Sequence, residues 1–213
     1  MINFWKGVLP EKIIITPIPA LTKSVGKELE MRKNIRGTPW WSAIKGYYRG
    51  KEICIVNCGT GALAGDCVLF LAGEENIKEL IFAGLAGSVG DKFSPGDVCG
   101  LKEYGGGAGF IEFLESDFPK NIPKTALNKF DNGGITPRSA SVYTTPSLFR
   151  EKEIFDALGE LGFDLIDMET AFVIPAAARE KIKLSFVYYV SDYRLTFQKI
   201  KLKTFKDICL RSA

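Results

Sequence analysis

Short apolar runs alternate with segments of helical spacing along most of the chain. Apolar runs bounded by Gly, Pro or charged residues predict strands over residues 12–16, 78–87, 96–104, 139–144, 164–168 and 184–191. Apolar residues three and four positions apart predict helices over residues 20–33, 61–75, 148–161, 169–181 and 202–211. The segment 44–59 is typical of a hairpin with Arg49, Gly50 and Lys51 at its turn.

The order of these elements predicts the fold class. Strands that alternate with helices are typical of α/β folds with a largely parallel sheet, and the hairpin adds an antiparallel pair. We therefore expect a single α/β domain over residues 1–213, with a mixed, mostly parallel central sheet flanked by helices. The Gly-rich stretch 105–109 lacks the Lys-Ser/Thr of a P-loop, so this stretch and the Pro-, Asn- and Gly-rich stretch 115–138 are predicted to be loops.

Composition limits the classes of function. Of the 213 residues, 46% are hydrophobic and 25% are charged, which is ordinary for a globular protein. The net charge of +3 comes without a basic block, which argues against a nucleic-acid or membrane-surface partner. No apolar run approaches the roughly 20 residues that span a bilayer, and the N-terminus lacks the apolar region of a signal peptide. We expect a cytoplasmic protein.

Cysteine and histidine usage narrows the chemistry. The five cysteines are an odd number scattered over apolar segments, so they are predicted to be reduced core residues. The chain has no histidine, which excludes Ser-His-Asp and Cys-His nucleophilic machinery and His-ligated zinc. Acid–base chemistry must therefore use Asp, Glu, Lys, Tyr or Cys, and neither a metal nor a cofactor is predicted.

Carboxylates stand in two segments that otherwise have core composition. The stretch FDLIDMETAF (163–172) holds Asp164, Asp167 and Glu169 among apolar residues. The stretch LSFVYYVSDYR (184–194) ends its apolar run with Asp192. Because an unpaired buried charge is costly, such acids are paired, stand at a strand end, or bind something.

Four predicted strands end in residues suited to a ligand. In open α/β sheets, ligands bind outside the carboxyl ends of the strands. Two of the ends are Gly-rich turns, at Gly59-Thr60-Gly61 and from Gly84 to Ser88. The other two are dipeptides that contain an acid, Met168-Glu169 and Ser191-Asp192. Gly-rich turns let the backbone approach a ligand closely, so the four ends together predict one binding site.

Three of these segments resemble signatures of the nucleoside phosphorylase and nucleosidase superfamily. They are IFAGLAGSVGDKFSPGDV (81–98), DLIDMETAFVIPAAARE (164–180) and YYVSDYR (188–194), and VNCGTGALAGD (56–66) precedes them in the right order. The resemblance covers most of residues 51–195. It implies a nucleoside phosphorylase-like fold, cleavage of the N-glycosidic bond of a purine-type nucleoside, and assembly as a homo-oligomer.

The resemblance also implies roles for the catalytic and ribose-binding residues. Asp192 would be the general acid that protonates the departing purine at N7. Glu169 would accept hydrogen bonds from the ribose hydroxyls, since a carboxylate suits a vicinal diol, and Met168 would pack against the sugar. An exposed Asp titrates near roughly 3.9, so burial or a contact with the base would have to raise the pKa of Asp192.

The residues expected around the base follow from the same resemblance. Phe149 lies about where relatives stack an aromatic side chain on the base, and Ser191 and Gly87 are expected beside it.

Structural interpretations of these acids stay open at this point. Glu169 could simply complement the N-terminus of the helix that follows it. Asp192 could cap a helix or pair with Arg194. Asp164 and Asp167 are best explained as exposed or paired strand residues.

The nucleophile end departs from the family pattern. Phosphorylases of this family bind phosphate with arginines and a serine near the first and third strand ends, but here Phe82 and Leu85 stand at the expected Arg and Ser positions. Gly61, Gly84 and Arg36 are the candidates for this region, with Arg36 matching an arginine that relatives lend to a neighbouring subunit. The loop ITPIPALT (15–22) also lacks the carboxylate that a hydrolase would use.

On balance we expect water rather than phosphate as the nucleophile. Phosphate-dependent cleavage is the first alternative, and a nucleoside-binding protein without catalysis is the second. A Rossmann-like nucleotide-binding domain is disfavoured because the glycines at 59, 61 and 65 do not have the G-x-G-x-x-G spacing.

Overall fold

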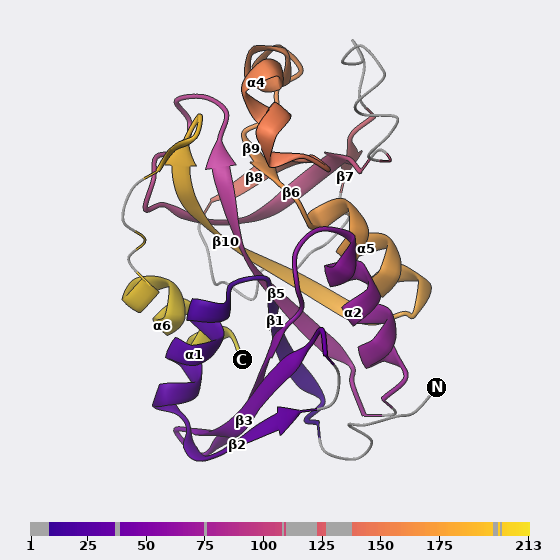
Figure 1. Cartoon of the computed structure of the whole chain (residues 1–213), viewed down its shortest axis with the longest axis vertical. Helices are drawn as coiled ribbons and strands as arrows, with labels where there is room; N and C mark the ends of the chain where they lie inside the picture. Colours follow the sequence, from indigo (N-terminus) through magenta and orange to yellow (C-terminus); the bar gives the residue numbers. More distant parts are fainter. Residues whose placement is uncertain are drawn as a thin grey trace.

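Helices separate single strands and groups of consecutive strands along the chain (Figure 1). The computed structural model describes residues 9–36, 39–74, 76–107, 109, 123–126, 138–197, 200 and 202–213. The strands are β1 (Lys12–Thr16), β2 (Glu30–Arg36), β3 (Ser42–Tyr48), β4 (Lys51–Asn57), β5 (Glu79–Ser88), β6 (Val98–Gly106), β7 (Thr125–Ala126), β8 (Ser139–Thr144), β9 (Leu165–Asp167), β10 (Lys183–Tyr193) and β11 (Thr196–Phe197). The helices are α1 (Pro19–Glu28), α2 (Ala62–Ala72), the 3-10 turn η1 (Leu148–Arg150), α4 (Glu151–Glu160), α5 (Thr170–Arg179) and α6 (Leu202–Ser212).

Most of the predicted elements are confirmed, including the hairpin β3–β4, whose turn holds Arg49 and Gly50 at positive φ. The helix predicted over 20–33 is wrong beyond Glu28, because the chain turns there into β2, which pairs with β3. The loop predictions are wrong where β6 extends through 105–106 and where β7 forms within 115–138. Most of that second stretch lies outside the described residues.

The strands form one mixed sheet in the order β11-β10-β6-β8-β9-β5-β1-β4-β3-β2, with β7 beside β6. The centre of the sheet is parallel: β1 pairs in parallel with β4 and β5, and β5 pairs in parallel with β10. Since β10 also pairs with β5, the strands β5, β10, β6, β8 and β9 close into a small barrel. The sequence predicts the mixed sheet but not this closure.

Helices cover both faces of the central strands, which explains their continuous apolar runs. Successive side chains of a strand point to opposite faces. In β1, Ile13 and Ile15 join the core under α2 and α5, whereas Ile14 joins the core under α1 and α6. Figure 1 shows these two helix pairs on opposite sides of β1 and β5. None of the helices within the described residues combines the length and apolarity that a membrane crossing requires.

A third core positions the helix α4 at one end of the barrel, beside β9 (Figure 1). It consists of Val89, Tyr143, Ile154, Phe155, Leu158, Phe163 and Ile166. The apolar residues of α4 in this cluster, Ile154, Phe155 and Leu158, are three and four positions apart, as expected of one helix face. The first turn of α4 is thereby held over the ends of the barrel strands.

All five cysteines are buried and free, as predicted. Burial raises the pKa of the Cys54 thiol to about 12, so it is a protonated core residue rather than a nucleophile.

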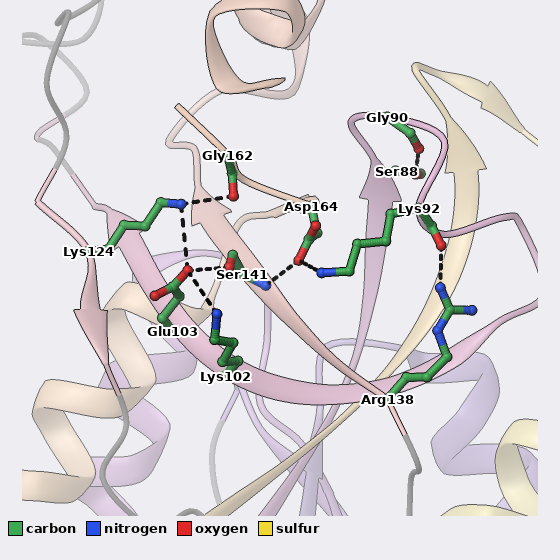
Figure 2. Close-up of polar contacts among 10 residues, drawn as sticks. All are labelled: Ser88, Gly90, Lys92, Lys102, Glu103, Lys124, Arg138, Ser141, Gly162 and Asp164. Carbon is green, nitrogen blue, oxygen red and sulfur yellow. Dashed lines mark hydrogen bonds and ion pairs between the residues drawn. The ribbon is translucent and has the colours of Figure 1, made fainter. Parts of the chain in front are cut away.

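Asp164 is a paired strand-end residue, as predicted, and it ties several segments together (Figure 2). Its Oδ2 accepts hydrogen bonds from Lys92 Nζ at 2.7 Å and from the backbone N–H of Ser141 at 2.9 Å. The hydroxyl of Ser141 donates to Glu103, which also lies 3.5 Å from Lys124 Nζ. These contacts join β6, β8 and the loop before β9, and they give Asp164 a structural role.

The contact between α2 and α5 depends on a glycine. A Cβ atom on Gly65 would lie 2.9 Å from the carbonyl oxygen of Phe172, closer than real Cβ atoms approach. We expect Gly65→Ala to lower the free energy of unfolding by about 1–3 kcal/mol, although alanine is the better helix former. Gly159→Ala in α4 is the matched control, because its Cβ would meet only Val89 at 3.9 Å, and it should be neutral or stabilising. Urea denaturation of both variants measures the difference; equal stability changes would contradict the prediction.

Candidate active site

A cavity of about 220 Å³ lies where the carboxyl ends of β5 and β10 meet β9. The loop after β1 and the turn before α2 also reach it, as the strand-end rule predicts. Its lining includes five of the predicted site residues: Gly87, Met168, Glu169, Ser191 and Asp192. The structure therefore brings the predicted acid, both predicted ribose residues and two of the three predicted base residues into one cavity.

Asp192 is held in this cavity by an irregularity of β10. The pairing of β10 with β5 shifts between Val190 and Asp192, so Ser191 is an extra residue in the strand. Such bulges re-aim side chains beside active sites. Asp192 is 4% exposed and lies against Gly87, where a Cβ would come within 2.9 Å of its Oδ2. Glycine at this position thus leaves room for the carboxyl group.

Two hydrogen bonds fix the Asp192 carboxyl. Oδ1 accepts from Ser191 Oγ at 2.6 Å, and Oδ2 accepts from the N–H of Leu195 at 3.0 Å. The chain turns back to make the second bond through Arg194 and Leu195, which have positive φ of 44° and 64°. Non-glycine residues adopt such φ values at a cost, so the turn is maintained by its surroundings. Arg194 itself pairs with Asp156 at 2.8 Å, so the interpretation of Asp192 as its partner is wrong.

Glu169 reaches across the site instead of capping its own helix. It occupies the N-cap position of α5 without a side-chain capping bond, and it is 5% exposed. Its Oε1 accepts the N–H of Gly61, at the start of α2, at 2.9 Å. Burial, followed by the charge of Asp167, raises the pKa of Glu169 to about 8. The two carboxylate oxygens keep capacity for further donors such as hydroxyl groups.

Asp167 is paired, as predicted, but it also lines the cavity. It accepts hydrogen bonds from Thr144 Oγ1 at 2.7 Å and from the N–H and hydroxyl of Thr170. The Thr170 hydroxyl also contacts Tyr188 OH. Burial raises the pKa of Asp167 to about 6, and the threonine bonds oppose that rise. These bonds link β8, β9, α5 and β10 directly beneath the cavity.

Four predicted site residues are absent from the cavity lining, and the side chain of one of them, Arg36, is not described. The Phe149 side chain is 93% exposed, and its neighbour Leu148 lines the cavity instead. Gly84 lies in β5, where a Cβ would collide with the Phe82 ring at 2.5 Å, so packing explains the glycine. Gly61 acts through its N–H on Glu169. Arg36 ends β2, and its side chain lies outside the described residues.

The sequence prediction missed Glu151, Leu195 and Phe197, which also line the cavity. Glu151 is the first residue of α4, where an acid is common because it complements the helix N-terminus. Its sequence context therefore carries no signal of a site. Its burial, at 4% exposed, comes only from the packing of α4 onto the barrel.

The charge of the lining is one-sided. Four carboxyl side chains contribute to it, from Glu151, Asp167, Glu169 and Asp192, and no Lys or Arg of the described residues does. Phe82, which the resemblance aligned with an arginine position of phosphorylases, is fully buried and packs against Phe186 at 5.5 Å between ring centroids. Across residues 9–36, 39–74 and the other described ranges, no group of three His, Cys, Asp or Glu side chains is placed to hold a metal ion.

Comparison with known proteins identifies the family. The family model described as phosphorylase superfamily matches residues 12–208. The chain belongs to the phosphorylase superfamily. The superfamily match covers all elements that form the cavity, from β1 to β10 and most of α6.

Several curated members of the superfamily are similar over nearly the whole chain. The purine nucleoside phosphorylase DeoD-type 2 of Vibrio vulnificus (strain YJ016) is 25% identical over 236 residues, covering 97% of this chain and 93% of the relative. The purine nucleoside phosphorylase DeoD-type of Histophilus somni (strain 2336) is 25% identical over 217 residues, covering 93% and 87%. That of Lactococcus lactis subsp. lactis (strain IL1403) is 23% identical, covering 90% and 85%.

Proposed function

We propose that this protein cleaves the N-glycosidic bond of purine nucleosides. The observation that carries the proposal is the convergence of Asp192 and Glu169 in one buried cavity at the strand ends. Asp192 provides the proton for the departing base, and Glu169 accepts hydrogen bonds from the ribose hydroxyls. Met168, beside Glu169 in the lining, supplies an apolar contact for the sugar.

Cleavage of this bond builds positive charge on the ribose and negative charge on the base. A carboxyl group that gives its proton to the base relieves the second charge, and carboxylates around the sugar stabilise the first. The acidic lining of the cavity is suited to both tasks.

As the resemblance implies, we propose that the enzyme is a homo-oligomer.

Phosphate is the first candidate for the nucleophile. The curated relatives that match over nearly the whole chain are named purine nucleoside phosphorylases, which favours phosphate over the water expected from the sequence. Arg36 is the candidate residue for holding it, by the resemblance noted above.

Water is the second candidate, and the cavity lining favours it. A phosphate dianion needs cationic or N–H donors. The described side chains around the cavity include four carboxyl groups and no Lys or Arg. Pro17, Ile18, Leu85 and Ala86 make the side of the cavity near β1 and β5 apolar.

The proposal is tested by measuring base release with and without phosphate. The substrates are adenosine, inosine, guanosine, methylthioadenosine and futalosine. Release that requires phosphate and yields the 1-phosphate of the substrate's sugar identifies a phosphorylase. Release at an equal rate without phosphate, yielding the free sugar, identifies a hydrolase. If no purine nucleoside loses its base under either condition, the proposed function is wrong.

A further inference from the structure

Glu151 is a buried carboxyl group without a partner. It is 4% exposed and lines the cavity from the first turn of α4. The two arginines that pair with acids of α4 do so with residues other than Glu151. Arg150 pairs with Glu153 at 2.8 Å, and Arg194 pairs with Asp156 at 2.8 Å. Within the part of the chain that the structure describes, no donor bonds the Glu151 carboxyl.

The other three carboxyls of the cavity differ from it in this respect. Asp192, Asp167 and Glu169 each accept at least one hydrogen bond from a fixed N–H or hydroxyl group. Hydrogen bonds to a carboxylate favour its charged form, and neighbouring negative charges favour the neutral form. Of these two influences, only the neighbouring charges act on Glu151, so no hydrogen bond of the described residues holds its carboxyl group in the charged form.

The electrostatic surroundings agree with this assignment. Burial, then the charges of Asp192 on β10 and Asp167 on β9, raise the pKa of Glu151 to about 8. Glu169, at the start of α5, adds a third carboxyl to the same cavity. At neutral pH the Glu151 side chain is therefore mostly a neutral carboxylic acid, with one O–H donor and one C=O acceptor.

Building on the proposed function, we propose that Glu151 is a base-recognition residue whose neutral carboxyl group hydrogen-bonds the purine ring beside Asp192. A purine presents a ring nitrogen next to an amino or carbonyl substituent, and this pair combines one donor with one acceptor. A neutral carboxylic acid complements such a pair with two hydrogen bonds. An ionised carboxylate has no donor to offer, and it adds a charge next to Asp192.

The affinity for adenine, measured by calorimetry at pH 6.5 and pH 9.0, tests this role without requiring catalysis. Glu151→Gln retains one donor and one acceptor but cannot ionise. We expect its Kd to lie within about threefold of the wild-type value at pH 6.5. At pH 9.0 the wild-type protein should bind about tenfold more weakly than Glu151→Gln, because only about a tenth of Glu151 is then neutral. Both proteins meet the same ligand, so ionisation of adenine cancels in the comparison.

Two further variants complete the design. Glu153→Gln, two residues along on the exposed side of α4, is the matched control and should follow the wild-type protein at both pH values. Glu151→Met fills the same space without a hydrogen-bonding group, so it should bind adenine about tenfold more weakly than wild type at pH 6.5. A merely structural role for Glu151 would leave adenine affinity unchanged in this variant.

The outcomes separate this inference from the proposed function. Equal affinities of wild type and Glu151→Gln at pH 9.0, or a large loss in Glu151→Gln at pH 6.5, would overturn the role of the neutral carboxyl even if nucleosides are cleaved. The expected pattern in a protein that cleaves no nucleoside would support base recognition by Glu151 and reject the proposed function. A wild-type protein that binds no purine would reject both.

Discussion

Replacement of Asp192 by asparagine is expected to lower kcat for base release from a purine nucleoside by about 10²–10⁴-fold, the usual contribution of a general acid. The fold should tolerate the change, because the asparagine side chain would keep both native contacts. Its Oδ1 can accept the N–H of Leu195, and its amide can donate to Ser191 Oγ. The KM should change by less than about threefold, since the variant removes a proton and little binding surface.

Steady-state kinetics and a thermal melt of the same preparation check this prediction. Asp164→Asn is the control, because Asp164 bonds Lys92 and Ser141 outside the cavity lining. The control should lose stability and keep its kcat. An Asp192→Asn variant with wild-type kcat would show that the proton for the base comes from another group, and Glu151 would be the first to examine.

The residues of the site were predictable wherever a strand end coincided with an unusual acid. Asp192 and Glu169 stand out in the sequence because each interrupts an apolar run, and burial of a charge requires an explanation. Gly87 could be found from its place near a predicted strand end, although the Gly-rich turn predicted over residues 84–88 is wrong, because these residues belong to β5. The structure places these residues around one cavity because the carboxyl ends of β5 and β10 lie side by side.

Other features depend on contacts that no local pattern encodes. The chain after Glu28 is rich in helix formers, yet it becomes β2 because pairing with β3 outweighs local propensity. The closure of the barrel depends on β10 pairing with β5 on one side and β6 on the other. Glu151 enters the site only through the packing of α4 on that barrel, so it looked like an ordinary acid at a helix N-terminus.

The acids of the cavity should make the protein less stable as the pH rises. The pKa of Glu169 is raised from its ordinary value of 4.5 to about 8, mainly by burial. Between these two values the folded protein holds a proton on Glu169 that the unfolded chain has released. The stabilisation from this group is therefore complete below about pH 4.5 and is lost as the pH rises through about 8. Glu151 and Asp167 act in the same direction.

Glu169→Gln isolates the contribution of one acid. Glutamine stays neutral, and its Oε1 can still accept the N–H of Gly61. We expect the variant to match the wild-type free energy of unfolding at pH 5 and to exceed it by about 2–4 kcal/mol at pH 9, at about 1.4 kcal/mol for each unit of pKa difference. Urea denaturation without ligand across this range measures both curves, with exposed Glu160→Gln as the control. Parallel curves would contradict the prediction.

The same substitution should weaken the enzyme while it stabilises the fold. At pH 9 most of Glu169 is ionised, and a ribose hydroxyl bonds a carboxylate more strongly than an amide. We therefore expect kcat/KM for a purine nucleoside at pH 9 to fall by about 10–100-fold in Glu169→Gln. A gain in stability at high pH together with a loss of activity would show that Glu169 is kept buried for its ligand, at the expense of the fold. A gain in stability with unchanged activity would instead mean that Glu169 does not contact the ribose.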